Sequence, residues 1–361
     1  MSIELLHKLL MVIAEKGIND LHLSVGALPA VRKNGEVHFL SQLTPITMAD
    51  MDSIMKQVLK PEMLDELNQS NHLAFAYSIP GKGRYRVIAY RQRGTFAITF
   101  RASNFTVPDK SKLRLPDETD GIFDLESGLV LVTGTKNSGV TTTCSYILDR
   151  MRTTKRFHIV TIENPIEYLY SYDKSIVSQM DVGLDVEDMQ TGIEIAIKDN
   201  ADVIYLSEMI DTKTIRLALE AARSGKLVIS TMDIFGATDV IRNIIDVFPS
   251  EASNYIRTLL SQSLKCIVSQ QLIPDRDGGL VPLCEIVYGI KAVSNLIREN
   301  KIIQIDKVIA NSETTNMLSK DNHLVRLFKN GLISSETLKD LADDWNSVSI
   351  LVSRTGEQAQ S

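Results

Sequence analysis

Four apolar runs that alternate with helical segments dominate the middle of this 361-residue chain. The runs are GLVLVT, HIVTIE, DVIYLSE and KLVISTM, at residues 128–133, 158–163, 202–208 and 226–232. Strand–helix alternation of this kind predicts right-handed βαβ units and a mainly parallel sheet. In such sheets ligands bind at the carboxyl ends of the strands. Because each run ends in a polar or glycine-containing segment, we expect these ends to meet at one site.

The first run leads into GTKNSGVTTT, residues 134–143, which has the outline of a phosphate-binding loop. The general pattern is G-x-x-x-x-G-K-[ST], placed between a strand and a helix. Gly134 and Gly139 keep the glycine spacing, and Thr141 keeps the hydroxyl that would hold Mg²⁺. The lysine of the pattern is replaced by Val140, so an apolar side chain stands where a cation would reach the phosphates.

This valine does not by itself abolish phosphate binding, because backbone N–H groups and a helix N-terminus can hold phosphates without any side chain. What it removes is a charge on the transferring phosphoryl group. By analogy with other deleted electrostatic stabilisers, that loss is about 3–4 kcal/mol, or roughly 10²–10³ in rate. Asn137 tolerates positive φ better than most residues, so the loop can keep its shape. Lys136 either reaches back to the phosphates as a replacement cation or is a solvated side chain. The expected nucleotide-binding residues are Gly134, Lys136, Asn137, Ser138, Gly139, Val140, Thr141 and Thr142, with Thr141 also the metal ligand.

Acidic side chains follow the second and third runs. Glu163 ends the second run, and Glu208 ends the third. A carboxylate beside the loop could orient an attacking water or hold Mg²⁺ through water. The alternative is that both are solvated charges at the rim of the sheet. We treat Glu163 and Glu208 as the candidate catalytic residues.

The pattern along the chain predicts two domains, which the length allows. Residues 1–101 form an α+β domain with an amphipathic first helix and short alternating strands. Residues 102–120, with two prolines and seven charged residues, form a linker. Residues 121–361 form the domain with the parallel sheet. Beyond about residue 252 we expect mostly helix, with a short hairpin-like stretch around 276–279.

Composition excludes several classes of protein. Lys+Arg number 39 against 45 Asp+Glu, a net charge of −6, so no overall basic field favours nucleic acid or an anionic membrane. No apolar run approaches the roughly 18 residues of a transmembrane helix, and the first 17 residues lack the features of a signal peptide. Cys144, Cys266 and Cys284 are far apart, which supports neither a zinc site nor a disulfide framework. We expect an intracellular protein without membrane insertion.

Several segments together resemble the type IV pilus retraction ATPases (PilT/PilU-like) of the secretion ATPase superfamily, and the resemblance covers nearly the whole chain. The segments that carry it are NDLHLSVGALPAVRKNGEV (19–37), GRYRVIAY (83–90), TIENPIEY (161–168), DVIYLSEMIDTKTIRLALEAARSGKLVISTM (202–232), IIDVFPSE (244–251) and AVSNLIRE (292–299). The last resembles the family's AIRNLIRE segment, which is associated with retraction. Its residues Asn295, Leu296, Ile297, Arg298 and Glu299 are therefore the candidate interaction residues.

The resemblance implies an N-terminal PAS-like α+β domain, followed by a RecA-like P-loop domain with a mainly parallel sheet and a helical C-terminal part. It also implies ATP and Mg²⁺ as cofactors and a ring-shaped hexamer. That ring would be homomeric or shared with a retraction ATPase paralogue, and would lie in the cytoplasm at the inner-membrane base of the pilus. There it would contact the platform protein of the pilus and serve twitching motility.

The chain departs from the family pattern at positions where the family has the residues of its nucleotide site. The family's loop reads GPTGSGKSTT, and its lysine corresponds to Val140. The histidine of the family's histidine box corresponds to Asp233, and two arginines correspond to Ile210 and Glu194. These exchanges remove positive charge and add negative charge where a nucleotide would bind. The sequence therefore predicts an impaired or inactive ATPase that serves as an accessory subunit.

Two alternatives remain. The first is an active ATP-hydrolysing retraction motor with a rewired site, formed by Lys136, Thr141, Glu163 and Glu208. The second is a nucleic-acid-binding protein, for which the only indications are the RecA-like fold and the arginines of residues 84–93. Those arginines alternate along a strand and are more often a subunit interface or a solvated face.

Overall fold

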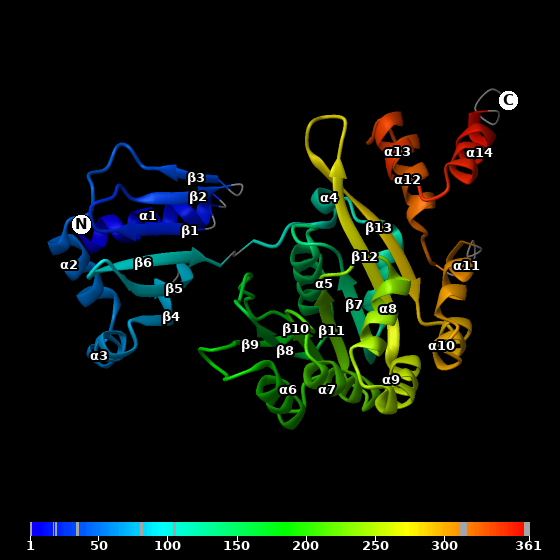
Figure 1. Ribbon diagram of the computed structural model, residues 1–361, viewed down its shortest axis with the longest axis horizontal. Coiled ribbons are helices and arrows are strands. Elements are labelled where there is room, and N and C mark those ends of the chain that lie inside the picture. Colours follow the sequence, from blue (N-terminus) through cyan, green and yellow to red (C-terminus); the bar gives the residue numbers. More distant parts are fainter. Residues whose placement is uncertain are drawn as a thin grey trace. The chain divides into compact units, whose positions relative to one another are not determined.

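The computed structural model describes residues 2–16, 18, 20–33, 36–79, 82–103, 106–310 and 316–356 (Figure 1). The chain divides into two compact units. The first unit comprises Met1–Thr106, Asn164–Tyr170 and Met180–Glu187, and the second comprises Val107–Glu163, Ser171–Gln179 and Asp188–Ser361. Among the described helices, none is both long enough and apolar enough to cross a membrane.

The first unit is built on a six-stranded sheet in the order β3-β2-β1-β6-β5-β4. Every neighbouring pair in it is antiparallel. The elements are α1 (Ile3–Glu15), β1 (Asp20–Ser24), β2 (Ala30–Lys33), β3 (Glu36–Phe39), α2 (Met48–Val58), α3 (Pro61–Ser70), β4 (His72–Ile79), β5 (Gly83–Gln92) and β6 (Thr95–Ala102).

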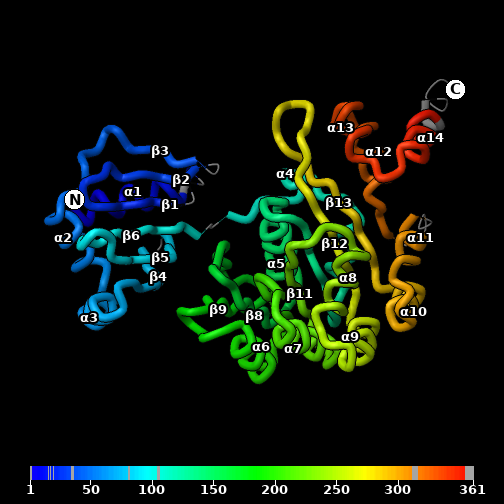
Figure 2. Tube along the Cα trace, viewed as in Figure 1, coloured from blue at the N-terminus to red at the C-terminus, as the bar shows by residue number. Residues whose placement is uncertain are grey.

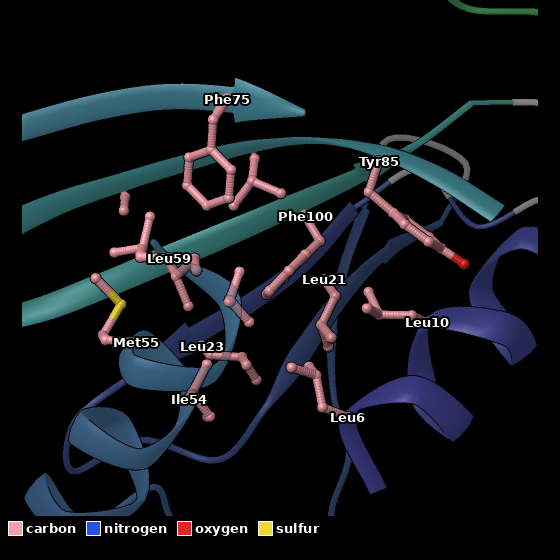
Figure 3. Close-up of a cluster of buried hydrophobic side chains, with 14 of the residues drawn as sticks. Leu6, Leu10, Leu21, Leu23, Ile54, Met55, Leu59, Phe75, Tyr85 and Phe100 are labelled. Atoms are coloured by element: carbon pink, nitrogen blue, oxygen red, sulfur yellow. The ribbon is translucent and has the colours of Figure 1, made fainter. Parts of the chain in front are cut away.

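The core of the first unit lies between the helices and one face of this sheet. Leu6 and Leu10 of α1 are completely buried, as their four-residue spacing predicts for an amphipathic helix. They meet Leu21 of β1 and Phe100 of β6, and Ile54 of α2 belongs to the same cluster (Figure 3). Full burial of one such aliphatic side chain stabilises the fold by about 1.5–3 kcal/mol. Alternate residues of the strands therefore face the helices, and the residues between them face the opposite side.

The second unit contains a seven-stranded sheet in the order β13-β12-β7-β11-β10-β8-β9. Strands β12, β7, β11, β10 and β8 pair in parallel. The four predicted apolar runs form four of these parallel strands, which confirms the mixed α/β class. The strands are β7 (Gly128–Thr133), β8 (His158–Glu163), β9 (Ile176–Asp181), β10 (Val203–Leu206), β11 (Leu227–Met232), β12 (Leu264–Pro274) and β13 (Leu280–Tyr288).

Helices cover this sheet and form the C-terminal part of the chain (Figure 2). A short helix and a 3-10 helix lie at the end of the predicted linker and just beyond it. The helical elements are α4 (Lys110–Leu113), η1 (Asp117–Asp124), α5 (Val140–Thr154), α6 (Met189–Lys198), α7 (Thr212–Arg223), α8 (Ala237–Asp246), α9 (Ser250–Ser263), α10 (Lys291–Arg298), η2 (Ile302–Gln304), α11 (Ile305–Ala310), α12 (Lys320–Lys329), α13 (Ser335–Leu341) and α14 (Trp345–Gly356).

Beyond residue 252 the chain is mostly helical, and the hairpin expected around residues 276–279 is present but much longer than a short stretch, because it occupies residues 264–288. This segment forms β12 and β13, two long antiparallel strands, and β12 also pairs in parallel with β7. Most residues of β12, LKCIVSQQLIP, are buried, and apolar residues point to both faces, because a strand in the middle of a sheet is covered on both sides. Such a run has no alternation that would separate a strand from a helix.

Candidate nucleotide site

The loop after β7 has the backbone conformation of a phosphate cradle. It begins where the Gly134 N–H donates to the carbonyl of Met232, at an N···O distance of 3.1 Å. Asn137 and Gly139 both adopt positive φ, at 66° and 82°. Glycine takes this left-handed conformation freely, and asparagine is one of the few other residues that tolerate it. Asn137 therefore adopts the positive φ that its side chain was expected to tolerate.

A buried glutamine of β12 holds the C-terminal end of the loop and the start of α5. Gln270 is 2% exposed, and its Nε2 donates to the carbonyl of Ser138 at 2.6 Å. Its Oε1 accepts from the hydroxyl of Thr143 at 2.8 Å. The backbone of Gln270 lies so close to Gly134 that a Cβ on this glycine would be 2.1 Å from the Gln270 carbonyl oxygen. Glycine at position 134 is therefore a steric requirement.

Gln270 is not among the residues predicted from the sequence, although one feature of the sequence indicates it. Two consecutive glutamines interrupt an otherwise apolar run. A buried polar side chain needs a hydrogen-bond partner, so at least one of them had to face a polar segment of the fold.

The cradle has free donors that fit a phosphate. Helix α5 starts at Val140, and its cap residue, Gly139, has no side chain to bond the first N–H groups. The hydroxyl of Ser138 is buried and has no hydrogen-bond partner among the described residues. The hydroxyl of Thr133, at the end of β7, is in the same state. Exposed N–H groups at the positive end of a helix, next to unpartnered hydroxyls, are what an anion needs.

The remaining loop residues lie as follows. Val140, Thr141 and Thr142 form the first turn of α5 and are partly buried. Lys136 is exposed at the tip of the loop and forms no ion pair within the described part of the chain. It is also the only cationic residue in the segment 134–143.

The two candidate catalytic carboxylates differ in their surroundings. Glu163 is 3% exposed, and its Oε1 accepts from the hydroxyl of Thr161 at 2.6 Å and from Nε2 of Gln179 at 3.2 Å. Glu208 is half-buried just beyond β10. Burial raises the pKa of Glu208, and the nearby Asp233 carboxylate raises it further. Both effects disfavour the charged form.

Backbone hydrogen bonds bring Glu208 and Asp233 to the start of the loop. The N–H of Met209 donates to the carbonyl of Thr231 at 3.1 Å, which places residues 207–209 alongside the end of β11. Asp233 directly follows Met232, whose carbonyl accepts from Gly134. Neither Glu208 nor Asp233 forms an ion pair with a cation in the described ranges.

Asp211, two residues farther along the chain from Met209, has a structural role. Its Oδ1 accepts from the N–H groups of Lys213 and Thr214, at 2.9 and 3.0 Å, and so caps α7. Gln190 of α6 also donates to both carboxylate oxygens. The neighbouring residue is Ile210, so an apolar side chain, 69% exposed, occupies this position in place of a cation.

The candidate interaction residues lie on and just after α10. Ile297 is fully buried, and Asn295 and Leu296 are partly buried. Arg298 and Glu299 are exposed, and Glu299 pairs with Lys301 at 2.7 Å. The part of this segment that a partner can reach is therefore mainly its charged end.

The arginines of β5 and the following turn are largely occupied within the first unit. Arg86 bonds the buried Asp181 at 2.8 Å, and Arg84 lies 3.6 Å from Asp185. The guanidinium of Arg91 lies 4.4 Å from the centre of the Phe96 ring. Arginines held in this way offer few free charges to a nucleic-acid backbone.

A glycine-shaped phosphate cradle at the carboxyl edge of a mainly parallel sheet defines an α/β protein of the phosphate-binding-loop class. The family model described as "Type II/IV secretion system protein" matches residues 104–318. The chain is 35% identical over 335 residues to "Type IV pilus retractation ATPase PilT" of Pseudomonas aeruginosa, covering 93% of this chain and 97% of the relative. It is 28% identical to "Type IV pilus ATPase PilU" of the same species, covering 96% and 90%.

Among solved structures, the crystal structure of the pilus retraction motor PilT with bound ADP superimposes with a TM-score of 0.84 at 34% identity, covering 94% of this chain and 98% of that one. The chain therefore belongs to the type IV pilus retraction and twitching motor family, within the Type II/IV secretion system proteins.

Proposed function

We propose that this chain is an accessory subunit of a type IV pilus retraction machine, with ATP hydrolysis that is lost or very slow. One observation carries the proposal: the loop keeps the conformation of a phosphate cradle, whereas its lysine position holds Val140. The backbone part of the site supports binding, and the missing cation argues against rapid phosphoryl transfer.

In this proposal the backbone N–H groups of the loop and of the start of α5 hold the phosphates, apart from those of Gly134 and Ser138, which donate to carbonyls of the chain. The hydroxyl of Thr141 would hold Mg²⁺. Bound ATP with Mg²⁺ would supply the phosphoryl group and the charge that organises it. Glu208 would lie beside the attacking water. Its raised pKa makes it a stronger base whenever it is ionised, so the slow hydrolysis proposed here is assigned to the missing cation and not to Glu208. Glu163 would act from a buried, hydrogen-bonded position at the end of β8.

The proposed setting follows from the family. The subunit would join a ring-shaped hexamer, alone or with a retraction ATPase paralogue, in the cytoplasm at the inner-membrane base of the pilus. The exposed residues Arg298 and Glu299 would face the pilus platform protein or another partner of the machine. Its effect on twitching would then depend on assembly and not on its own turnover.

A second candidate is an active retraction motor with a rewired site. It is favoured by the position of Lys136, which is exposed on the loop and has no ion pair in the described part of the chain. If Lys136 supplies the missing charge, a Lys136→Ala variant loses whatever activity the protein has. If activity exists and is unchanged in Lys136→Ala, the rewired site is wrong.

The deciding experiment is steady-state ATP turnover of the purified full chain, compared with a Val140→Lys variant. We expect turnover well below about one per second for the natural chain. The lysine variant is expected to gain roughly 10-fold or more, because it restores one of the lost cations. Turnover of the natural chain at or above about one per second would contradict an accessory role.

A further inference from the structure

We propose that the cradle selects a nucleoside diphosphate over the corresponding triphosphate, and that Glu208 and Asp233 are the selectivity-determining residues. This inference rests on the nucleotide binding proposed above. It goes further because it names the ligand that the site holds and the side chains that exclude the other one.

The two carboxylates lie at the carboxyl ends of neighbouring strands. Glu208 follows β10 and Asp233 follows β11, and these strands are neighbours in the parallel sheet. Gly134, the first residue of the cradle, bonds the residue before Asp233. Ligands of such sheets sit outside the carboxyl ends of the strands. Both side chains therefore flank the space into which a bound nucleotide extends from the loop.

The loop offers different groups to the inner and the outer phosphates of a nucleotide. Backbone N–H groups and the start of α5 hold the inner phosphates, and in the general pattern a lysine reaches the outer ones. Here the inner part of this arrangement is complete: the two left-handed residues are in place, and Gln270 fixes the loop. The outer part is missing, because Val140 provides no charge. The cradle is thus complete for the inner phosphates, and the only cation that the loop offers to a third phosphate is the exposed Lys136 at its tip.

The carboxylates of Glu208 and Asp233 would repel a terminal phosphate. Glu208 and Asp233 have no cationic partner in the described ranges, so their charge is not cancelled locally. A terminal phosphate adds negative charge and brings it toward these carboxylates. At separations of several ångströms and an effective dielectric constant near 20, such repulsion reaches a few kcal/mol, and solvent screening at a half-open site reduces it. We therefore expect a preference for the diphosphate of about tenfold or more when no divalent cation is present.

A divalent cation should weaken this preference. Mg²⁺ is usually held by one or two carboxylates together with phosphate oxygens. The described residues contain no group of three or more His, Cys, Asp or Glu side chains that could hold a metal unaided. The phosphates themselves would therefore have to complete any Mg²⁺ site here, and the cation would shield the terminal phosphate from Glu208 and Asp233.

The experiment is isothermal titration calorimetry on the full chain. ADP is compared with a non-hydrolysable β,γ-imido analogue of ATP, each in EDTA and each in excess Mg²⁺. The test variant is Asp233→Asn, and Glu208→Gln serves as a second variant should the first fold poorly. The matched control is Asp246→Asn, which removes the same charge from the exposed far end of α8.

In EDTA we expect ADP to bind at least about tenfold more tightly than the ATP analogue. Asp233→Asn should improve binding of the analogue several-fold and change ADP binding less than about twofold, whereas Asp246→Asn should change neither. Equal affinities, or a preference for the analogue, would overturn the selectivity and leave the nucleotide site standing. Binding of neither nucleotide would overturn the site itself. An equal gain from Asp246→Asn would show that net charge, and not position, is responsible.

Discussion

Replacing Gln270 by leucine tests whether this side chain holds the loop. Leucine has a similar volume, so the change removes hydrogen bonds with little change in packing. The carbonyl of Ser138 and the hydroxyl of Thr143 lose their partners, and these two residues are 2% and 1% exposed. A buried polar atom without a partner costs about 1–3 kcal/mol. Because the Thr143 hydroxyl can turn to a carbonyl of its own helix, the expected total is about 2–4 kcal/mol.

The assay is urea unfolding followed by tryptophan fluorescence. The single tryptophan, Trp345, lies in the second unit together with Gln270, so its signal reports the unfolding of that unit. The matched control is Gln271→Leu, at the next position of β12, where the side chain is partly buried. Gln271→Leu should change the free energy of unfolding by no more than about 0.5 kcal/mol.

The same variant should also bind ADP more weakly, because the loop would have to be ordered at the moment of binding. A Thr143→Ser variant keeps the hydroxyl and should behave like the natural chain. If Gln270→Leu unfolds at the same urea concentration as Gln271→Leu and binds ADP equally well, the loop holds its own shape and the role given to Gln270 is wrong.

Two further predictions concern the same unit. Gly134→Ala should destabilise it by about 1–3 kcal/mol, since the new methyl group would meet the Gln270 carbonyl oxygen; an unchanged urea midpoint would contradict this. Burial and the nearby Arg326 lower the pKa of His323 to about 4. Between about pH 6.5 and pH 4, His323 is therefore protonated in the unfolded chain and neutral in the folded chain. The free energy of unfolding should therefore fall as the pH drops from about 6.5 to about 4. In His323→Asn, whose amide oxygen can still accept from the N–H of Cys284, this part of the pH dependence should disappear, and its persistence would assign it to another group.

The parallel strands and the loop could be predicted because their causes are local. Each of the four runs is a short apolar segment followed by a change to polar residues, and the glycine spacing of 134–139 is visible in the sequence. The left-handed conformation expected at Asn137 also depends only on the residue itself. Local patterns of this kind determine the elements and the position of the cradle.

The contacts that complete the site could not be predicted, because they join distant parts of the chain. Gln270 bonds a residue 132 positions away, and this pairing exists only because β12 is placed beside β7. The proximity of Glu208 to Asp233 likewise depends on the order of β10 and β11 in the sheet. Nothing in the sequence of one strand states which strand will lie next to it.

The composition of the first unit shows the same limit. Asn164–Tyr170 and Met180–Glu187 cluster with the N-terminal residues, although the first segment follows β8 and the second contains the last two residues of β9. Buried polar contacts connect them to the first unit: Arg86 bonds Asp181, and the Ser103 hydroxyl donates to the carbonyl of Ile166 at 2.9 Å. A boundary drawn from changes in sequence pattern is continuous by construction and leaves such returning segments out.

Binding of phosphates and transfer of a phosphoryl group depend on different parts of such a site. Holding phosphates depends on backbone N–H groups, and these keep their direction as long as Gly134, Asn137 and Gly139 allow the loop its shape. Transferring a phosphoryl group depends on side-chain cations, and each of these can be lost by a single substitution that leaves the backbone unchanged. In the proposed function, Val140 and Asp233 would therefore reduce turnover before they reduce binding. Such a subunit would still bring a nucleotide-filled site to an assembly, and measuring affinity and turnover on the same preparation tells the two contributions apart.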